Sequence, residues 1–214
     1  MVGIIIGLIL VGLNSLFKLF LPSPVVHVLL VVSSVVITGA LHLDGFVDIC
    51  DGIAGHKTPE ERWQVMHGSW VGAFGIIGAC CLLLVKYVSL NSVPETLLMA
   101  TLVLMPVISR WTMVYAVFAY PYAKPSGLGK VFKQEASWQK LVMATLIALV
   151  VAIVLAKLMG VAIMLGIWII ITVMATYLKR KFAGLTGDTY GAINEVAEVC
   201  VLILVCLLAR LGLA

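Results

Sequence analysis

The sequence predicts an all-α protein, a polytopic bundle of about seven transmembrane helices. Of its 214 residues 63% are hydrophobic and 11% are charged, whereas a soluble globular domain is about half apolar and a quarter charged. Several apolar runs also approach the roughly 20 residues that cross a bilayer as a helix, with only short interruptions between them. A single integral membrane domain over 1–214 is therefore expected in preference to two soluble ones.

The elements follow in order from these runs. The first, in MVGIIIGLILVGLN, has no basic start and no small-residue cleavage site, so it is expected to stay in the mature chain as a span. The second is rich in Val and Ile, but its length without polar alternation favours a helix, since lipid offers the backbone no hydrogen-bond partner. Pro106 falls inside the fourth and is expected to kink it. The seven predicted spans are 3–21, 24–41, 71–90, 96–118, 140–156, 160–178 and 191–212.

Basic residues are unevenly distributed over the connections, which predicts an orientation. Most lie in three loops, at about 42–70, 119–139 and 179–190. By the positive-inside rule these loops face the cytoplasm of a cell inner membrane, and they are expected to form the active-site face. The modest net charge of +4 and the lack of a nucleic-acid motif make the bilayer, and not nucleic acid, the expected partner. The opposite side is expected to hold Lys18, Lys86, Lys157 and Arg210.

The segment HLDGFVDICDG places Asp44, Asp48 and Asp51 at i, i+4 and i+7. On a helix continuing from the second span, the three carboxylates project from one face. They would repel each other without a cation, and hard oxygen ligands at this density suit Mg²⁺ or Mn²⁺, which also bind substrate phosphates. A solvated helix end above the membrane is the alternative. His42 is expected either to orient an aspartate or bind phosphate, or to be an interfacial residue.

Three other positions are candidate substrate contacts. Arg110 lies within MPVISRWTMVYA, where a guanidinium must find an anion, a cavity or the interface. Phosphate fits its fork best, and an ion pair with one of the aspartates is the alternative. The loop YPYAKPSGLGKVFKQ carries Lys124 and Gly127, which suit either a phosphate or anionic lipid. Ser69, in MHGSWVGAFG, is expected to bind substrate or to be interfacial.

A third polar cluster, GLTGDTYGAINEVAEV, opens the last predicted span. Helix capping explains Asp188 or Thr189, but it does not explain why Glu195 and Glu198 enter an apolar helix. Asn194 lies within one turn of both glutamates, so the three side chains can face the bundle interior together. The cluster is therefore interpreted as the second half of a metal or substrate site.

Taken in order, these segments resemble the cobalamin synthase family of adenosylcobinamide-GDP ribazoletransferases. The resemblance rests on GALHLDGFVDICDGIAG with the following ERW and GSWVGAFG, on SRW with YPYAKPSGLG, and on GLTGDTYGAINEVAEV, and covers about 39 to 200. It implies a Mg²⁺-dependent membrane transferase that joins adenosylcobinamide-GDP to α-ribazole or its 5′-phosphate, releasing GMP. The resemblance also leads us to expect a further segment ahead of VGIIIGL in family members, and the sequence given starts at about that point.

The resemblance also implies roles for the candidate residues. The product would be adenosylcobalamin or its 5′-phosphate, and a homo-oligomer and association with other cobalamin-assembly enzymes are expected. Whether Asp188, Asn194 or Glu195 completes the metal shell or accepts the hydroxyl proton stays open. The expected metal ligands are Asp44, Asp48, Asp51 and Glu195, the expected catalytic residues are Asp48, Asp51, Asp188 and Glu195, and the expected substrate-binding residues are His42, Ser69, Arg110, Lys124, Gly127 and Asn194.

Two other classes of protein also place acids in a helix bundle. A CDP-alcohol phosphotransferase carries an Ala-Arg pair soon after its first aspartates and a second aspartate pair later, and DGIAGHKTPEERW lacks both. A cation transporter usually binds its ion near the bilayer midplane on broken helices. The acids of this chain cluster at one mouth, which argues against transport.

Overall fold

The computed structural model describes residues 1–54, 58–66, 70–124 and 128–213, and within these residues every regular element is an α-helix. The all-α prediction is thereby confirmed. The helices are α1 (Val2–Phe17), α2 (Ser23–Ile37), α3 (Leu41–Ile53), α4 (Pro59–Met66), α5 (Ala73–Asn91), α6 (Glu95–Ala119), α7 (Leu128–Gln134), α8 (Trp138–Phe182) and α9 (Gly187–Arg210).

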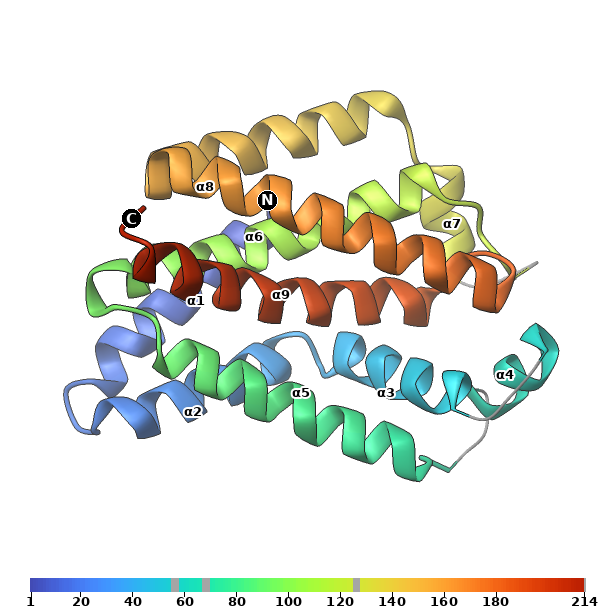
Figure 1. Ribbon diagram of the computed structural model, residues 1–214, viewed down its shortest axis with the longest axis horizontal. Helices are drawn as coiled ribbons and strands as arrows, with labels where there is room; N and C mark the ends of the chain where they lie inside the picture. Colours follow the sequence, from blue (N-terminus) through green and yellow to red (C-terminus); the bar gives the residue numbers. More distant parts are fainter. Residues whose placement is uncertain (55–57, 67–69, 125–127, 214) are drawn as a thin grey trace.

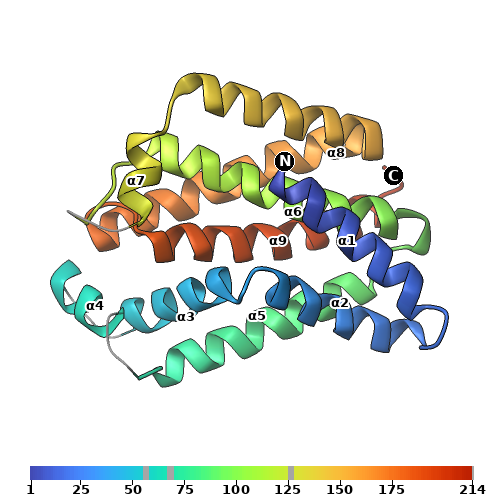
Figure 2. The same ribbon diagram turned by 180° about the vertical axis from the view of Figure 1, so that it is seen from behind.

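The long helices run side by side along the long axis of the molecule (Figure 1). Helix α9 lies at the centre, packed against α3, α5, α6 and α8, and α1 crosses α6 on the far side (Figure 2). Helices α4 and α7 and the α8–α9 junction gather at one end, which we call the loop end. The three loops predicted to share a face therefore meet at this end.

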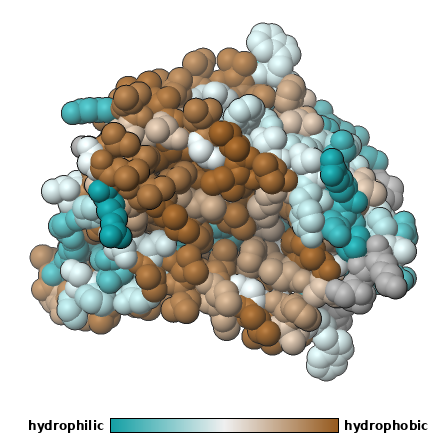
Figure 3. Space-filling model, viewed as in Figure 1, coloured by the Kyte–Doolittle hydropathy of each residue, from teal (hydrophilic) through white to brown (hydrophobic). Residues whose placement is uncertain are grey.

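Four helices are long and apolar enough to cross a membrane: α5, α6, α8 and α9. Helices α2 and α3 pass the same test as a pair, which raises the number of candidate spans to five. Apolar side chains cover the middle of the visible face and hydrophilic ones gather toward both ends (Figure 3), as expected of a protein whose middle lies in lipid. The polytopic bundle is confirmed, and the predicted count of seven spans is approximate.

The predicted spans 140–156 and 160–178 together form α8. This helix is broken at Lys157, where the backbone (φ 49°, ψ −130°) leaves helical geometry. Figure 1 shows the two arms folded back on each other. A side chain at Gly160 would collide with the backbone of Ala152, so the absence of a Cβ there lets the arms approach closely.

The second predicted span does not continue into the aspartate segment, and that expectation was wrong. The chain bends by 89° between α2 and α3. Gly39 (φ 60°) and Ala40 (φ 58°) both adopt left-handed backbone conformations, which a right-handed helix cannot incorporate. The bend lays α3 along α9 instead of extending α2.

Two glycines set the contact between α3 and α9. A Cβ added to Gly45 would lie 2.8 Å from the backbone oxygen of Asp188, and one added to Gly191 would lie 3.0 Å from the backbone oxygen of His42. Both positions are therefore in backbone-to-backbone contact, as in the close helix crossings of membrane proteins. This contact places the acidic face of α3 beside the first turn of α9.

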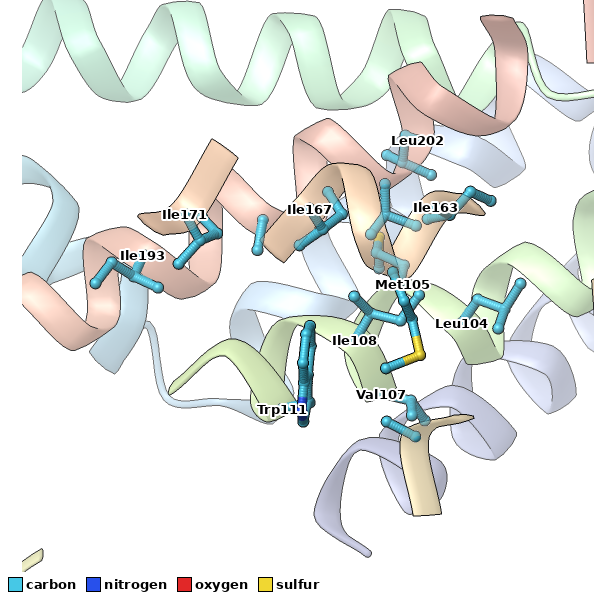
Figure 4. Close-up of a cluster of buried hydrophobic side chains, with 14 of the residues drawn as sticks. Leu104, Met105, Val107, Ile108, Trp111, Ile163, Ile167, Ile171, Ile193 and Leu202 are labelled. Carbon is cyan, nitrogen blue, oxygen red and sulfur yellow. The ribbon is translucent and has the colours of Figure 1, made fainter. Parts of the chain in front are cut away.

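The apolar core lies where α6, the second arm of α8 and α9 meet (Figure 4). Ile163, Ile167 and Ile171 recur every fourth residue on α8 and are each 0% exposed, so they form the buried stripe of that arm. Helix α6 contributes Ile108 and Trp111 to the same cluster and continues as a helix through Pro106. This rigid core holds the polar loop-end segments in place.

Candidate functional site

Three segments meet at the loop end: α3, the first turn of α9 and the chain that follows α6. The last is fixed to the α8–α9 junction by a parallel bridge between Tyr122 and Leu185. The Ala123 amide donates to the Leu185 oxygen and the Leu185 amide donates to the Pro121 oxygen, both at 2.8 Å. The bridge brings Lys124 Nζ within 3.3 Å of Asp188 Oδ2.

Asp188 lies in the first turn of α9, but it does not cap the helix. That role belongs to a reciprocal pair: the Thr189 amide donates to Thr186 Oγ1 at 3.3 Å, and the Thr186 amide donates to Thr189 Oγ1 at 2.7 Å. Thr186 Oγ1 also donates to Asp188 Oδ2 at 3.3 Å. The Asp188 carboxylate is thus oriented by a hydroxyl and an ammonium, and it remains available for chemistry.

The two outer aspartates of α3 join this group. Asp44 is exposed and Asp48 is half-buried, and Asp48 lies within electrostatic range of Asp44, Asp188 and Lys124. We call Asp44, Asp48, Lys124 and Asp188 the mouth cluster. It brings together a predicted metal ligand on α3, a predicted phosphate ligand after α6 and a predicted catalytic acid on α9.

Tyr122 borders the mouth cluster and packs against Gly129, where a side chain Cβ would lie 3.0 Å from the Tyr122 hydroxyl oxygen. Burial raises the pKa of the Tyr122 phenol, and the negative charge of Asp188 raises it further. The phenol is therefore protonated at neutral pH, so Tyr122 can donate a hydrogen bond at the mouth but cannot serve as a base there.

Asp51 is used differently from its predicted role. Its two carboxylate oxygens accept hydrogen bonds from the backbone amides of Gly72 and Gly75, each at 2.7 Å. These amides start α5, where helix N–H groups have no partner within the helix, so Asp51 ties α3 to the beginning of α5. Asp51 is buried, and this geometry does not leave it as an open ligand beside Asp44 and Asp48.

Four charged side chains meet inside the bundle, and we call them the buried tetrad: Lys86, Arg110, Glu195 and Glu198. Lys86 Nζ lies 2.8 Å from Glu195 Oε2 and 2.6 Å from Glu198 Oε2. Arg110 Nη1 donates to Glu198 Oε1 and, at 2.9 Å, to Ser109 Oγ. Two positive and two negative charges balance, as burial away from water requires.

The tetrad changes the interpretation of three predicted residues. Glu195 is held by Lys86, Arg110 forms an ion pair with a glutamate instead of the predicted aspartate alternative, and Asn194 Nδ2 lies 3.4 Å from Glu198 Oε1. In the part of the chain that the structure describes, no group of three or more His, Cys, Asp or Glu side chains could hold a metal. Ser69 and Gly127 lie outside the described residues.

Lys86 is the member of the buried tetrad that the sequence analysis misplaced. It was expected on the side of the membrane opposite the loops, but its side chain is 1% exposed and lies in the bundle core. The positive-inside rule counts charges in loops, so it assigns a lysine inside a span to the wrong place. The signal that could have identified it is the charge balance itself, because two glutamates entering an apolar helix require two cations.

A cavity of about 680 Å³ opens beside the tetrad, between α1, α6 and the first arm of α8. Most of its wall is apolar, including Trp111 and Phe132. His42 lines this cavity, as do Arg110 and Tyr190. The predicted substrate residues thus divide into two places, with Lys124 at the mouth cluster and His42 and Arg110 in the cavity wall.

The fold and the site together define the class of protein. It is a polytopic helical membrane protein with an acid- and lysine-lined mouth at one end of its bundle. A family model described as cobalamin-5-phosphate synthase matches residues 1–206. The chain is 35% identical to an adenosylcobinamide-GDP ribazoletransferase of Geotalea daltonii, over 98% of this chain and 85% of that one. It is 36% identical to that of Synechococcus elongatus, over 94% and 81% of the two chains, and 33% identical to that of Desulforamulus reducens, over 97% and 83%.

The chain therefore belongs to the cobalamin-5-phosphate synthase family, which confirms the resemblance seen in its sequence. No solved structure matches it. Membership in this transferase family sets aside the CDP-alcohol phosphotransferase and cation-transporter alternatives.

Proposed function

We propose that the mouth cluster carries out the transfer that its relatives' name describes. The reaction joins adenosylcobinamide-GDP to α-ribazole or its 5′-phosphate and releases GMP, giving adenosylcobalamin or its 5′-phosphate. The observation that carries the proposal is the meeting of Asp48, Lys124 and Asp188, which come from three separate blocks of the family resemblance.

The chemistry of the transfer suits these side chains. The ribazole hydroxyl oxygen attacks the phosphorus next to the cobinamide, a new P–O bond forms, and the bond to GMP breaks with its electron pair leaving on the GMP oxygen. Lys124 provides positive charge for the phosphate oxygens. The mouth-cluster carboxylates are the acceptors for the hydroxyl proton, and Thr186 keeps Asp188 oriented for that role.

A magnesium ion is also part of the proposal. One or two of the carboxylates of Asp44, Asp48 and Asp188 would hold it, because Asp51 and Glu195 are engaged by backbone amides and by Lys86. Mg²⁺ is usually bound by only one or two carboxylates and completes its shell with water and substrate phosphates, so three preassembled protein ligands are not required. When bound, the ion supplies positive charge to the diphosphate.

Substitutions at the mouth test its location as the site. Asp48→Asn and Asp188→Asn are expected to lower turnover by about 100-fold or more, the scale seen when a charge-stabilising group is lost. Glu60→Gln is the matched control, since Glu60 is an exposed carboxylate on α4 at the same end. Full turnover in both aspartate variants would move the reaction away from the mouth cluster.

Chelation tests the metal. Removal of divalent cations is expected to stop turnover and addition of Mg²⁺ to restore it, while the Asp48→Asn and Asp44→Asn variants require higher Mg²⁺ concentrations. Undiminished turnover in the presence of chelator would contradict the proposal.

The loop end is proposed to face the cytoplasm of the inner membrane, because the three basic loops gather there. An impermeant thiol reagent tests the orientation. Glu60→Cys at the loop end should react in inverted vesicles and not in spheroplasts, and Ser92→Cys, at the junction of α5 and α6, should show the reverse. The opposite labelling pattern would invert the orientation. A homo-oligomer and association with other cobalamin-assembly enzymes stay predictions, to be tested by native mass and by copurification.

A further inference from the structure

The cavity and the mouth cluster are built from the same helices. On α3, Asp44 belongs to the mouth cluster, and His42, two residues earlier, lines the cavity. On α9, Asp188 belongs to the mouth cluster, and Tyr190, two residues later, lines the cavity. Two such residues differ by only about 3 Å along the helix axis. The cavity therefore adjoins the mouth cluster, and a ligand held in it lies next to the proposed reacting groups.

The volume of the cavity distinguishes the two substrates of the proposed reaction. About 680 Å³ is within the range of about 300–1,000 Å³ that encloses a drug-sized ligand. α-Ribazole, a nucleoside, is of that size. Adenosylcobinamide-GDP is several times larger, so the cavity could enclose only one end of it.

The lining of the cavity favours an apolar ring. Helix α6 contributes Met113, Val114 and Val117, and the first arm of α8 contributes Ala144 and Ile147. All five are only partly buried, so part of their apolar surface is accessible. The base of α-ribazole is mostly hydrocarbon and suits such a wall. The guanine of the GDP group would leave amide and amino groups without partners there, which is costly away from water.

The wall also supplies hydrogen-bond donors. Arg110 uses Nη1 for both of its hydrogen bonds, and 15% of its side chain is exposed, so Nε and Nη2 stay available. His42 is partly exposed, and its ring forms no hydrogen bond to another described residue. Either side chain can donate to the one ring nitrogen of the base that does not carry the ribose. The ribose hydroxyls can pair with the other polar groups of the wall, which include the amino group of Met1 and the Glu135–Lys140 pair.

We infer that the cavity is the binding site for the aromatic base of α-ribazole. Its free ring nitrogen accepts a hydrogen bond from Arg110 or His42, and its reacting ribose hydroxyl is directed toward the mouth cluster. Phe132 of α7 lines the cavity and is 62% exposed, so its ring is free to pack against the base. The corrinoid and the diphosphate stay outside the cavity. The inference rests on the proposed function for the identity of the nucleoside.

A variant that fills the cavity tests the assignment by its effect on each substrate separately. Ala144→Phe places a ring in the cavity, so the KM for α-ribazole should rise about tenfold or more, the scale of a substrate that no longer fits its pocket. The KM for adenosylcobinamide-GDP should not change, whereas a general loss of structure would affect both substrates. Met143→Phe is the matched control, because Met143 is the preceding residue, is 58% exposed and lies outside the cavity wall.

A second pair of variants tests the site without turnover. Phe132→Ala should weaken equilibrium binding of α-ribazole to the full chain in detergent about threefold to tenfold, the scale of one lost aromatic contact. Val131→Ala, on the same helix, should leave binding unchanged, because Val131 is 55% exposed and lies outside the cavity wall. Both side chains are exposed, so the two variants should unfold at the same temperature.

Three results would overturn the inference: no binding of α-ribazole by the wild-type chain, unchanged binding in both Ala144→Phe and Phe132→Ala, or equal rises of both KM values in Ala144→Phe. A phospholipid that copurifies with the wild type and is lost in Ala144→Phe, while α-ribazole binding is unchanged, would assign the cavity to a lipid tail instead. Failure of the proposed function would appear differently, as α-ribazole binding that both cavity variants weaken in a chain that releases no GMP.

Discussion

The buried tetrad makes a sharp prediction about Lys86. Lys86→Met removes the ammonium and keeps a side chain of similar length. Glu195 then loses its cation, because Arg110 contacts only Glu198. Removing one partner of a buried ion pair costs about 3–5 kcal/mol. At about 1.4 kcal/mol per tenfold, the ratio of folded to unfolded protein falls by roughly 100-fold to a few thousand-fold.

The compensating variant is the decisive comparison. Lys86→Met combined with Glu195→Gln removes one charge of each sign and leaves the Arg110–Glu198 pair intact. Since replacing a whole buried pair is often neutral, the double variant should lie within about 1 kcal/mol of wild type. Leu82→Met, one turn away on α5 and also buried, controls for packing, because Leu and Met differ little in volume.

Thermal unfolding in one detergent measures all four proteins. Soluble chains of this length shift by about 2–4 °C per kcal/mol, so Lys86→Met should melt roughly 6–20 °C below wild type. If Lys86→Met is as stable as Leu82→Met, then removing the Lys86 ammonium leaves no costly unpaired charge on Glu195, and the reasoning is refuted. A double variant as unstable as the single one would show that the loss came from packing of the lysine stem.

Three further predictions concern the loop end. Gly45→Ala should lower the free energy of unfolding by about 1–3 kcal/mol, because the new Cβ would lie 2.8 Å from the Asp188 backbone oxygen. Gly12→Ala is the control: its Cβ would meet open space, so it should stabilise α1 by up to about 1 kcal/mol. Equal melting temperatures of the two variants would refute the close contact. Asp51→Ala should lower stability by about 1–3 kcal/mol, because it leaves the Gly72 and Gly75 amides without acceptors. Asp51→Asn should have intermediate stability, and Asp48→Asn should be close to wild type. If Asp51→Asn instead lost turnover at unchanged stability, Asp51 would act in catalysis as the sequence predicted. The pKa of the Tyr122 phenol is raised above its ordinary, already alkaline value, so the phenol stays protonated at neutral pH. Tyr122→Phe should therefore not change the shape of the pH profile of turnover between about pH 6 and 9. If the variant lost a fall in turnover on the alkaline side that the wild type shows, this prediction would be wrong.

The helices could be predicted from sequence because hydrophobic runs report membrane burial directly. The gap predicted between 156 and 160 became the break at Lys157. The bend between α2 and α3 could not be predicted, since Gly39 and Ala40 carry no strong signal for two successive left-handed residues. The sequence correctly predicted that the three aspartates share one helix. It did not predict which side chains each aspartate meets, because that depends on the bend.

The sequence could predict which residues gather near the site, but not which contacts each of them makes. Spacing places Asp44, Asp48 and Asp51 on one helical face, yet only the neighbouring helices decide that Asp51 meets the α5 amides and Asp48 meets Asp188. Glu195 was correctly expected to face the bundle interior. Its partner, Lys86, lies more than a hundred residues earlier in the chain, and no local pattern links the two.

The most direct test of the account is the coupled yield of the two products by the purified chain in lipid or detergent with Mg²⁺, adenosylcobinamide-GDP and α-ribazole. We expect one GMP released for each corrinoid that gains a lower ligand, and loss of both products in Asp48→Asn. GMP release without a ligated corrinoid, or ion flux in proteoliposomes without turnover, would contradict it.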